Sequence, residues 1–369
     1  MLFVLAPSGA GADAERVCPT PPAGPSPLHV APYIADISAE HAVIRWVDGV
    51  GRWEGLVGPT GEMVRERVQA IPAGGGWVHS AVTPLRSAST VELFVNCGPW
   101  SGHAVRATPA PGPGTPVTFV ATGDNRSNDG DHAQIAAAID AAGPDVLINT
   151  GDMVMTGLPE HWTRFFEIER ALLRRTPLFA AMGNHEVIDR PGLYDVLFDC
   201  PRPGPRGTRS CVRDYGDLRV VQVDSESSPA SQADWLRSVL TETPQAGAKR
   251  VEVIAMHRPV YTFSRHPPDL EWRAVLHPIA VDADVEVVFQ GHNHTYERFE
   301  VDGVTYVTTG GGGAPRYPAN YAIRDSEAHL RKKGVSVLHY VVARVSAGRI
   351  DMEAVEPGAG TVIDKFQVD

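Results

Sequence analysis

Five short motifs with carboxylate, amide or imidazole side chains stand out because each follows an apolar run. In chain order they are Gly123-Asp124-Asn125-Arg126, Gly151-Asp152, Gly183-Asn184-His185-Glu186, His257 and Gly291-His292-Asn293-His294. The runs before them are rich in β-branched residues, which is typical of strands buried on both faces. Because ligands bind beyond the carboxyl ends of the strands in open α/β sheets, we expect these side chains to converge on one edge.

The donor atoms in these motifs form a set that suits metal ions. They are two carboxylates, one amide oxygen and three imidazoles, from Asp124, Asp152, Asn184, His257, His292 and His294. Nitrogen and oxygen donors without sulfur indicate Fe, Zn, Mn or Co. Six donors exceed the three or four protein ligands of one catalytic metal, and they predict two metals that share a carboxylate. A lone aspartate at a strand end is usually a helix cap, so the hypothesis depends on all five motifs together.

The elements that position these motifs are predicted from the apolar periodicity. Buried strands are expected at 117–122, 145–150, 178–182, 219–223, 251–256, 285–290 and 304–309. Helices are expected between them at 132–142, 161–175, 230–242 and 270–280. Strands that alternate with helices indicate a layered α/β fold. The end of the chain is expected to form a β-hairpin around Ala347-Gly348.

The N-terminal part of the chain has a different pattern. Short strand-like runs at 42–47, 63–71, 76–82 and 90–96 predict a small, fibronectin III-like β-sandwich. A stretch rich in proline and glycine at 107–116 is the expected domain boundary. The sequence therefore predicts a leader at 1–29, a β-sandwich domain at 30–110 and a catalytic domain at 117–369.

Length and charge narrow the classes of function. A chain of 369 residues is expected to form two domains. The net charge of −11 disfavours a nucleic-acid-binding protein, which normally presents a basic face. No window approaches the roughly 20 apolar residues of a membrane-spanning helix. We therefore expect a small-molecule substrate and no membrane span, while the oligomeric state is left open.

The cysteines and the N-terminus bear on the cellular compartment. Cys200 and Cys211 bracket a Pro- and Gly-rich loop, and a disulfide between them is predicted, together with a second between Cys18 and Cys97. The alternative is four buried thiols. The first residues combine a short apolar run with an A-D-A step, as in the end of a signal peptide, although a disordered terminus gives the same pattern. The disulfides and this leader together predict a secreted or periplasmic protein.

The five motifs taken together resemble those of the calcineurin-like metallophosphoesterases. The likeness covers about residues 117–310 and extends through GD, GD, GNHE, the isolated His257 and GHNH. The preceding β domain, the HRPVY segment and the GHNHTYER block are similar to those of the purple acid phosphatases. This resemblance implies a four-layer α/β/β/α core, which the periodicity does not establish.

The resemblance also implies which of two metals each donor binds, with Asp152 shared by both. The first metal is expected to bind two further residues, Asp124 and His294. The second metal is expected to bind Asn184, His257 and His292.

Two further residues, His185 and His266, are given substrate-facing roles by the resemblance. His185 matches a family histidine that contacts the phosphate or protonates the leaving group. Glu186 is expected to orient the imidazole of His185. His266 resembles a second substrate-facing histidine of the purple acid phosphatases, the alternative being an exposed loop position.

The chain departs from the family pattern at two positions near the first metal. Arg126 stands where many members have a metal-binding histidine, and Met155 stands where purple acid phosphatases have a tyrosine. The first metal is then expected to bind weakly, to take a water, or to recruit a nearby group such as His132. Arginine stays protonated, so Arg126 is expected either to clamp the phosphate or to pair with a nearby carboxylate.

The predicted function is hydrolysis of phosphoesters by a metal-activated hydroxide, with phosphomonoesters as the favoured substrates. One alternative is a phosphodiesterase that acts on nucleotides or lipid headgroups. Another is a binding or adhesion protein whose metal site has decayed. The glycine run at 310–315 lacks the Gly-Lys-Ser/Thr ending of a nucleotide-binding loop and is interpreted as a loop at the rim of the site.

Overall fold

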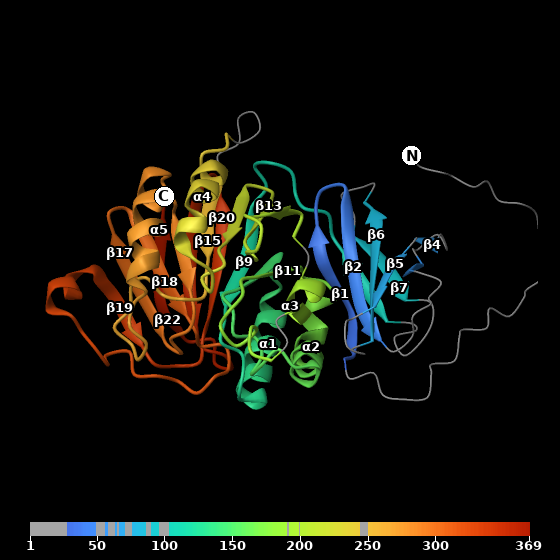
Figure 1. The fold of residues 1–369 in the computed structure, drawn as a ribbon, viewed down its shortest axis with the longest axis horizontal. Helices are drawn as coiled ribbons and strands as arrows, with labels where there is room; N and C mark the ends of the chain where they lie inside the picture. The colour runs from blue at the N-terminus through green and yellow to red at the C-terminus, as the bar shows by residue number, and fades with distance from the viewer. Residues whose placement is uncertain are drawn as a thin grey trace, which may run out of the picture.

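The computed structural model describes most of the chain in ten segments. They are 28–48, 56–57, 63–64, 66–70, 76–85, 90–95, 103–189, 192–198, 200–243 and 250–369. Figure 1 shows a group of strands at the N-terminal side next to a larger body of strands and helices. The predicted leader lies almost entirely outside the described residues, as do Cys18 and Cys97.

The N-terminal strands form two four-stranded sheets, as expected for a β-sandwich. One sheet has the order β1 (Val30–Ile37), β2 (His41–Asp48), β6 (Trp77–Pro84), β5 (Glu66–Ala70). The other has the order β4 (Met63–Val64), β3 (Leu56–Val57), β7 (Val91–Val95), β8 (Ala104–Ala107). The sequence pattern missed β1, because Pro32 and Asp36 interrupt its apolar run although the whole strand is buried. Residues 108–116 join β8 to the next strand without helix or strand, and the domain boundary placed there stays a prediction.

The larger body contains two further sheets. The six-stranded sheet has the order β11 (Leu178–Ala180), β10 (Val146–Asn149), β9 (Val117–Thr122), β20 (Tyr340–Ser346), β21 (Arg349–Val355), β22 (Val362–Val368). The eight-stranded sheet has the order β12 (Arg202–Pro203), β13 (Cys211–Tyr215), β14 (Leu218–Gln222), β15 (Val251–Ala255), β16 (Val287–Gln290), β18 (Val304–Thr309), β17 (Tyr296–Val301), β19 (Arg331–Val335). The hairpin predicted at Ala347-Gly348 joins β20 to β21.

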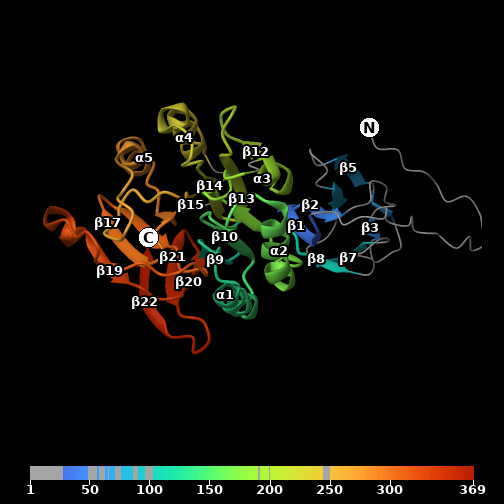
Figure 2. The same cartoon turned by 60° about the horizontal axis from the view of Figure 1, so that its bottom comes forward.

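Helices cover the outer faces of the two sheets (Figure 2). The first sheet is covered by α1 (Asp129–Ala142) and α2 (Pro159–Leu173), and the second by α4 (Ala233–Leu240) and α5 (Leu270–Asp282). The short helices are α3 (Gly192–Leu197), η2 (Pro229–Ser231) and η3 (Asp325–Leu330). Between the sheets lies a continuous apolar core, in which the rings of Phe119 and Phe289 meet edge to face at 5.9 Å. The predicted four-layer α/β/β/α fold is thereby confirmed.

The N-terminal sandwich packs on the helical side of the first sheet. The ring of Tyr33 on β1 lies 4.7 Å from that of Phe166 on α2. The hydroxyl of Tyr33 and the guanidinium of Arg45 both donate to the carbonyl oxygen of Leu197, at the end of α3. Apolar packing and buried hydrogen bonds therefore join the sandwich to the layered body.

One predicted disulfide is confirmed and one lies outside the described residues. Cys200 and Cys211 are bonded and close a loop with a sequence separation of 11 residues. Because Cys211 begins β13, the bond ties this loop to the edge of the eight-stranded sheet. Within the described part of the chain, no helix is long and apolar enough to cross a lipid bilayer.

Candidate metal centre

The predicted donors come together where the two sheets present the carboxyl ends of their strands. In the six-stranded sheet, β9, β10 and β11 run parallel, so the loops after them lie on one edge. In the other sheet, β15 and β16 are also parallel. The residues that follow these five strands are Asp124, Asp152, Asn184, His257, His292 and His294.

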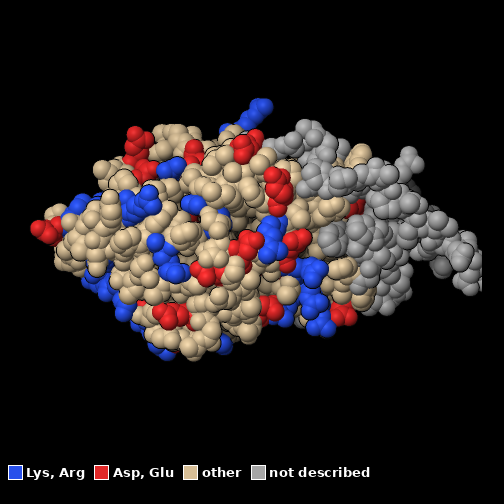
Figure 3. Space-filling model, turned by 90° about the horizontal axis from the view of Figure 1, so that it is seen from below, with Lys and Arg blue, Asp and Glu red and all other residues tan. Residues whose placement is uncertain are grey.

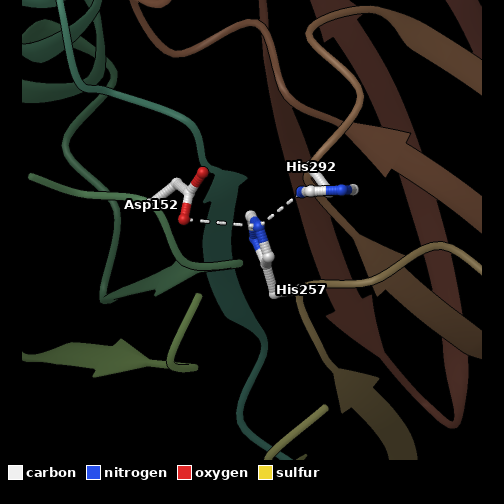
Figure 4. Close-up of side chains that lie close together, drawn as sticks. All are labelled: Asp152, His257 and His292. Carbon is white, nitrogen blue, oxygen red and sulfur yellow. Dashed lines mark hydrogen bonds and ion pairs between the residues drawn. The ribbon is translucent and has the colours of Figure 1, made fainter. Parts of the chain in front are cut away.

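Three of these side chains meet around the imidazole of a fourth, His257. Its Nε2 atom lies 3.1 Å from Asn184 Oδ1, 3.1 Å from His292 Nδ1 and 3.3 Å from Asp152 Oδ1. Figure 4 shows Asp152 and His292 pointing toward His257 from opposite sides. Among the described residues, these three form the one group of His, Cys, Asp or Glu ligand atoms that lie within 4.8 Å of one another. We call Asp152, Asn184, His257 and His292 the second metal position.

The remaining donors lie next to this group. Asp124 Oδ2 accepts a hydrogen bond of 2.9 Å from the backbone N–H of His292, and Asp124 Oδ1 lies 3.5 Å from Nε2 of His294. We call Asp124, Asp152 and His294 the first metal position. Asp124 is fully buried, and its Oδ1 has no hydrogen-bond partner among the described residues. A buried carboxylate oxygen without a partner is costly, so the site fits a cation.

Three of the donors have a strained backbone. Asp124, Asp152 and His292 have φ angles of 58°, 56° and 65°, in the left-handed region that side chains other than glycine rarely adopt. Such conformations cost on the order of 1–3 kcal/mol each and persist where the surroundings impose them. Three strained donors in one cluster indicate that the fold holds these groups for a function.

Glycines let the loops approach one another closely enough to form the site. A Cβ atom on Gly183 would lie 2.4 Å from Asp152 Oδ1, and one on Gly310 would lie 2.2 Å from the carbonyl oxygen of Asn293. The backbone of the 310–315 run bonds to the first loop, since Gly312 N–H donates to the carbonyl of Gly123. The glycine run is thus a loop beside the site, as predicted, and its lack of side chains is what brings it near Asp124.

Backbone carbonyls fix which nitrogen of two imidazoles faces inward. The Nδ1–H of His257 donates to the carbonyl oxygen of Thr150 at 3.0 Å, and that of His294 donates to Pro315 at 2.6 Å. Each Nε2 atom then carries a lone pair directed into the site, which is the arrangement of metal-binding histidines. The ring of Tyr317 stacks on His294 at 4.0 Å and holds its plane. No sequence signal singled out Tyr317.

Glu186 has a different role from the one expected. Its carboxylate does not orient His185; it accepts the backbone N–H groups of Gly183, Asp152, Met153 and Val154 at 2.7–3.3 Å. These bonds hold the loop after β10 in the conformation that places Asp152 in the site. His185 instead directs Nδ1 at the carbonyl oxygen of Met155, 2.6 Å away. Glu186 is therefore a positioning residue for the Asp152 loop.

Three groups in and beside the centre have shifted pKa values. Burial raises the pKa of Asp124, but His294 and the other histidines outweigh it and lower the pKa to about 2. Burial and the neighbouring His257 lower the pKa of His292 to about 2, so this imidazole stays neutral. Burial and the nearby carboxylate of Asp152 raise the pKa of Glu186 to about 7. Ionised carboxylate and neutral imidazole are the forms that bind metals.

The two histidines with predicted substrate roles lie at the rim of the centre. His185 Nε2 is 3.9 Å from Asp152 Oδ2, and 16% of the side chain is exposed. The ring of His266 packs at 4.1 Å from that of His292, and its backbone N–H donates to Asn293 Oδ1. Both imidazoles therefore line the approach to the donors, and their contact with substrate stays a prediction.

Arg126 and His132 have clear partners. Arg126 Nε donates to Asp152 Oδ2 at 3.1 Å. Of the two roles that the sequence leaves open for Arg126, this is the pairing with a carboxylate.

His132 is the extra ligand that the sequence offers for the first metal. It is buried, with Nε2 at 2.8 Å from Glu169 Oε1 and its ring stacked on Phe165. We therefore assign His132 to the packing of α1 on α2.

Comparison with known proteins agrees with this geometry. The model of the calcineurin-like phosphoesterase family matches residues 117–296, which span β9 to the start of β17. Over these residues the chain is similar to the calcineurin-like phosphoesterases. The five motifs all lie within the matched residues. This match supports hydrolysis of phosphoesters as the class of reaction.

Purple acid phosphatases are among the relatives of this chain. Purple acid phosphatase 22 of Arabidopsis thaliana is 24% identical over 305 residues, which cover 76% of this chain and 68% of the relative. Purple acid phosphatase 21 of the same plant is also 24% identical, over 64% of this chain and 58% of the relative. The structure of a purple acid phosphatase from yellow lupin seeds matches with a TM-score of 0.76 at 15% identity, over 93% of this chain and 74% of that one. This structural likeness establishes the fold.

Proposed function

We propose that this chain is a metal-dependent phosphomonoesterase. The observation that carries the proposal is the meeting of Asp152, Asn184, His257 and His292 around one point at the carboxyl ends of the strands. The unpartnered buried oxygen of Asp124 and the strained backbone of three donors support it. The metals bound are of the Fe, Zn, Mn or Co type, because the donors are imidazole, carboxylate and amide groups.

Metal ions held there would lower the pKa of a bound water and neutralise charge on the phosphate. The chain's own residues bind the metals, orient the metal ligands and protonate the leaving group. Asp152 directs Oδ1 at His257 in the second metal position and Oδ2 at Arg126, and Glu186 fixes the loop that carries it. Buried surroundings strengthen each of these charge interactions.

His185 is the proposed proton donor to the leaving oxygen. Its Nδ1 atom faces the carbonyl oxygen of Met155, so that nitrogen carries a proton and Nε2 faces the site. A proton on Nε2 can then pass to the leaving alkoxide as the ester bond breaks. His266, packed against His292 at the rim, is the proposed second contact for the phosphate or leaving group.

Arg126 favours monoesters over diesters by its charge. Its guanidinium adds a permanent positive charge beside Asp152. A phosphomonoester carries up to two negative charges and a diester one, so the monoester gains more from this field. A cavity of about 570 Å³ opens beside Arg126 and offers space for a leaving group; both apolar residues such as Met155 and charged residues such as Arg164 line it.

The surface is consistent with a small substrate rather than a nucleic acid. On the face drawn in Figure 3, acidic and basic side chains are interspersed instead of being gathered in a basic stripe. The disulfide between Cys200 and Cys211 supports a secreted or periplasmic location, because disulfides persist in oxidising compartments.

Two esters with the same leaving group test the preference. We expect kcat/KM for 4-nitrophenyl phosphate to exceed that for bis(4-nitrophenyl) phosphate by at least about tenfold, because the monoester carries the additional negative charge. A tenfold ratio corresponds to about 1.4 kcal/mol of transition-state binding. The measurement is the release of 4-nitrophenolate from each ester by the metal-loaded protein. A higher kcat/KM for the diester would contradict the monoesterase proposal and favour a phosphodiesterase.

A further inference from the structure

The guanidinium of Arg126 lies within the first metal position. Its Nε atom is 3.1 Å from Asp152 Oδ2, and its Nη2 atom is 3.3 Å from Nε2 of His294. These are two of the three side chains of that position. The other oxygen of Asp152, Oδ1, faces His257 in the second metal position. Asp152 therefore joins the second metal position to a guanidinium, as a bridging carboxylate would join two metals.

The side chain of Arg126 is held in this place by further contacts. Its backbone N–H donates to the carbonyl oxygen of Asp152 at 3.3 Å. Its Nη1 atom donates to Ser127 Oγ at 3.1 Å and lies 4.0 Å from the sulfur of Met155. Only 13% of the side chain is exposed. A guanidinium with these partners, paired to a buried carboxylate, is a built part of the site.

The same lone pair on His294 serves either the guanidinium or a metal ion. The Nδ1–H of His294 donates to the carbonyl of Pro315, which leaves Nε2 as the acceptor that faces Arg126. A metal ion at this position needs that lone pair and Asp152 Oδ2, both of which the guanidinium engages. A cation there is also repelled by the permanent charge of arginine. Arg126 and a first metal ion therefore compete for one place.

We infer that Arg126 takes the place of the first metal ion, so that this chain binds one metal tightly, at the second metal position. The guanidinium is then the second positive charge at the centre. Unlike a metal ion, it does not dissociate and does not depend on metal supply. The inference rests on the proposed function, because it assumes that the second metal position binds its ion.

A substitution that removes the guanidinium should open the first metal position. Asp124, Asp152 and His294 then offer three donors, and Asp124 Oδ1 already has no hydrogen-bond partner among the described residues. Arg126→His adds a fourth donor of the type found in many relatives of the family, and Arg126→Ala adds none. Arg164→Ala is the matched control, because Arg164 is half exposed, pairs with Asp129 and lines the same cavity without touching a donor.

The test is a metal count on purified protein. Each protein is stripped with a chelator, loaded with excess Zn²⁺, passed through a desalting column and analysed for zinc per chain. We expect about one zinc ion per chain in the wild type and in Arg164→Ala, and about two in Arg126→His. Calorimetric titration with Zn²⁺ is expected to show an added binding step in Arg126→His and a weaker one in Arg126→Ala.

The outcomes separate this inference from the proposed function. Two tightly bound zinc ions in the wild type would overturn the inference and leave the hydrolase proposal standing. An unchanged count of one in a folded Arg126→His would also overturn it. A wild type that binds neither zinc nor, under the same protocol, Mn²⁺, Fe²⁺ or Co²⁺ would overturn the proposed function and this inference with it. The number of zinc ions per wild-type chain tests the inference even if the Arg126 variants do not fold.

Discussion

Replacing Asp152 is expected to abolish hydrolysis of 4-nitrophenyl phosphate. Its Oδ1 atom faces His257 and its Oδ2 atom accepts from Arg126, so one carboxylate connects both parts of the centre. Its loss removes a metal ligand and leaves the guanidinium without its carboxylate. We expect kcat to fall by more than about 100-fold, since the loss of groups that only support metal ligands already costs about 10–100-fold.

Two variants separate chemistry from folding. Ala at a backbone φ of 56° costs on the order of 1–2 kcal/mol of stability, whereas Asn tolerates this region. Asp152→Asn therefore keeps the fold and removes the charge. Asp234→Asn, at a fully exposed carboxylate on α4, is the control and should turn over like the wild type. An Asp152→Asn protein that keeps more than about a tenth of the wild-type kcat would contradict the assignment.

Loss of the Glu186 carboxylate is expected to weaken metal binding without removing any metal ligand. The carboxylate accepts four backbone N–H groups from the loops that carry Asp152 and Asn184. In Glu186→Gln, the side-chain NH₂ group replaces one acceptor oxygen and cannot accept from a backbone N–H group. Each backbone N–H group left without an acceptor lowers the free energy of unfolding by about 1–3 kcal/mol. The Asp152 loop then relaxes from its strained conformation. We expect the affinity for Zn²⁺ to fall about 10–100-fold.

Competition with a chromophoric chelator measures this affinity, and thermal unfolding measures the loss of stability. Glu169→Gln is the matched control, because Glu169 is equally buried but pairs with His132 between α1 and α2. We expect both variants to unfold at a lower temperature and only Glu186→Gln to lose metal affinity. Equal zinc affinities for Glu186→Gln and the wild type would show that the carboxylate does not position Asp152.

Central strands were predictable because they are buried on both faces. The runs at 117–122 and 304–309 coincide with β9 and β18, whose residues are nearly all apolar or β-branched and buried. Strands with several charged residues, such as β17 and β19, were missed. In β17, Glu297 and Arg298 are buried, but each is paired, with Thr262 and Asp364 among their partners. A local pattern cannot show that a distant residue will neutralise a buried charge.

The convergence of the donors was foreseeable, while their supporting contacts were not. A polar residue directly after a buried strand must lie at that strand's carboxyl end, and this placed Asp124, Asp152 and His257 together. The role of Glu186 depends on two loops from neighbouring strands meeting in space. The position of Arg126 depends on the left-handed turn at Ser127, with a φ of 78°, which no residue pattern announced.

The central claim is that turnover depends on metal at this centre, and chelation of the wild-type protein tests it most directly. The protein is dialysed against a chelator, assayed with 4-nitrophenyl phosphate, then supplied separately with Zn²⁺, Mn²⁺, Fe²⁺ and Co²⁺ and assayed again. We predict that hydrolysis is lost with the metal and returns when at least one of these ions is restored. Undiminished hydrolysis by protein shown to be free of metal would contradict the account.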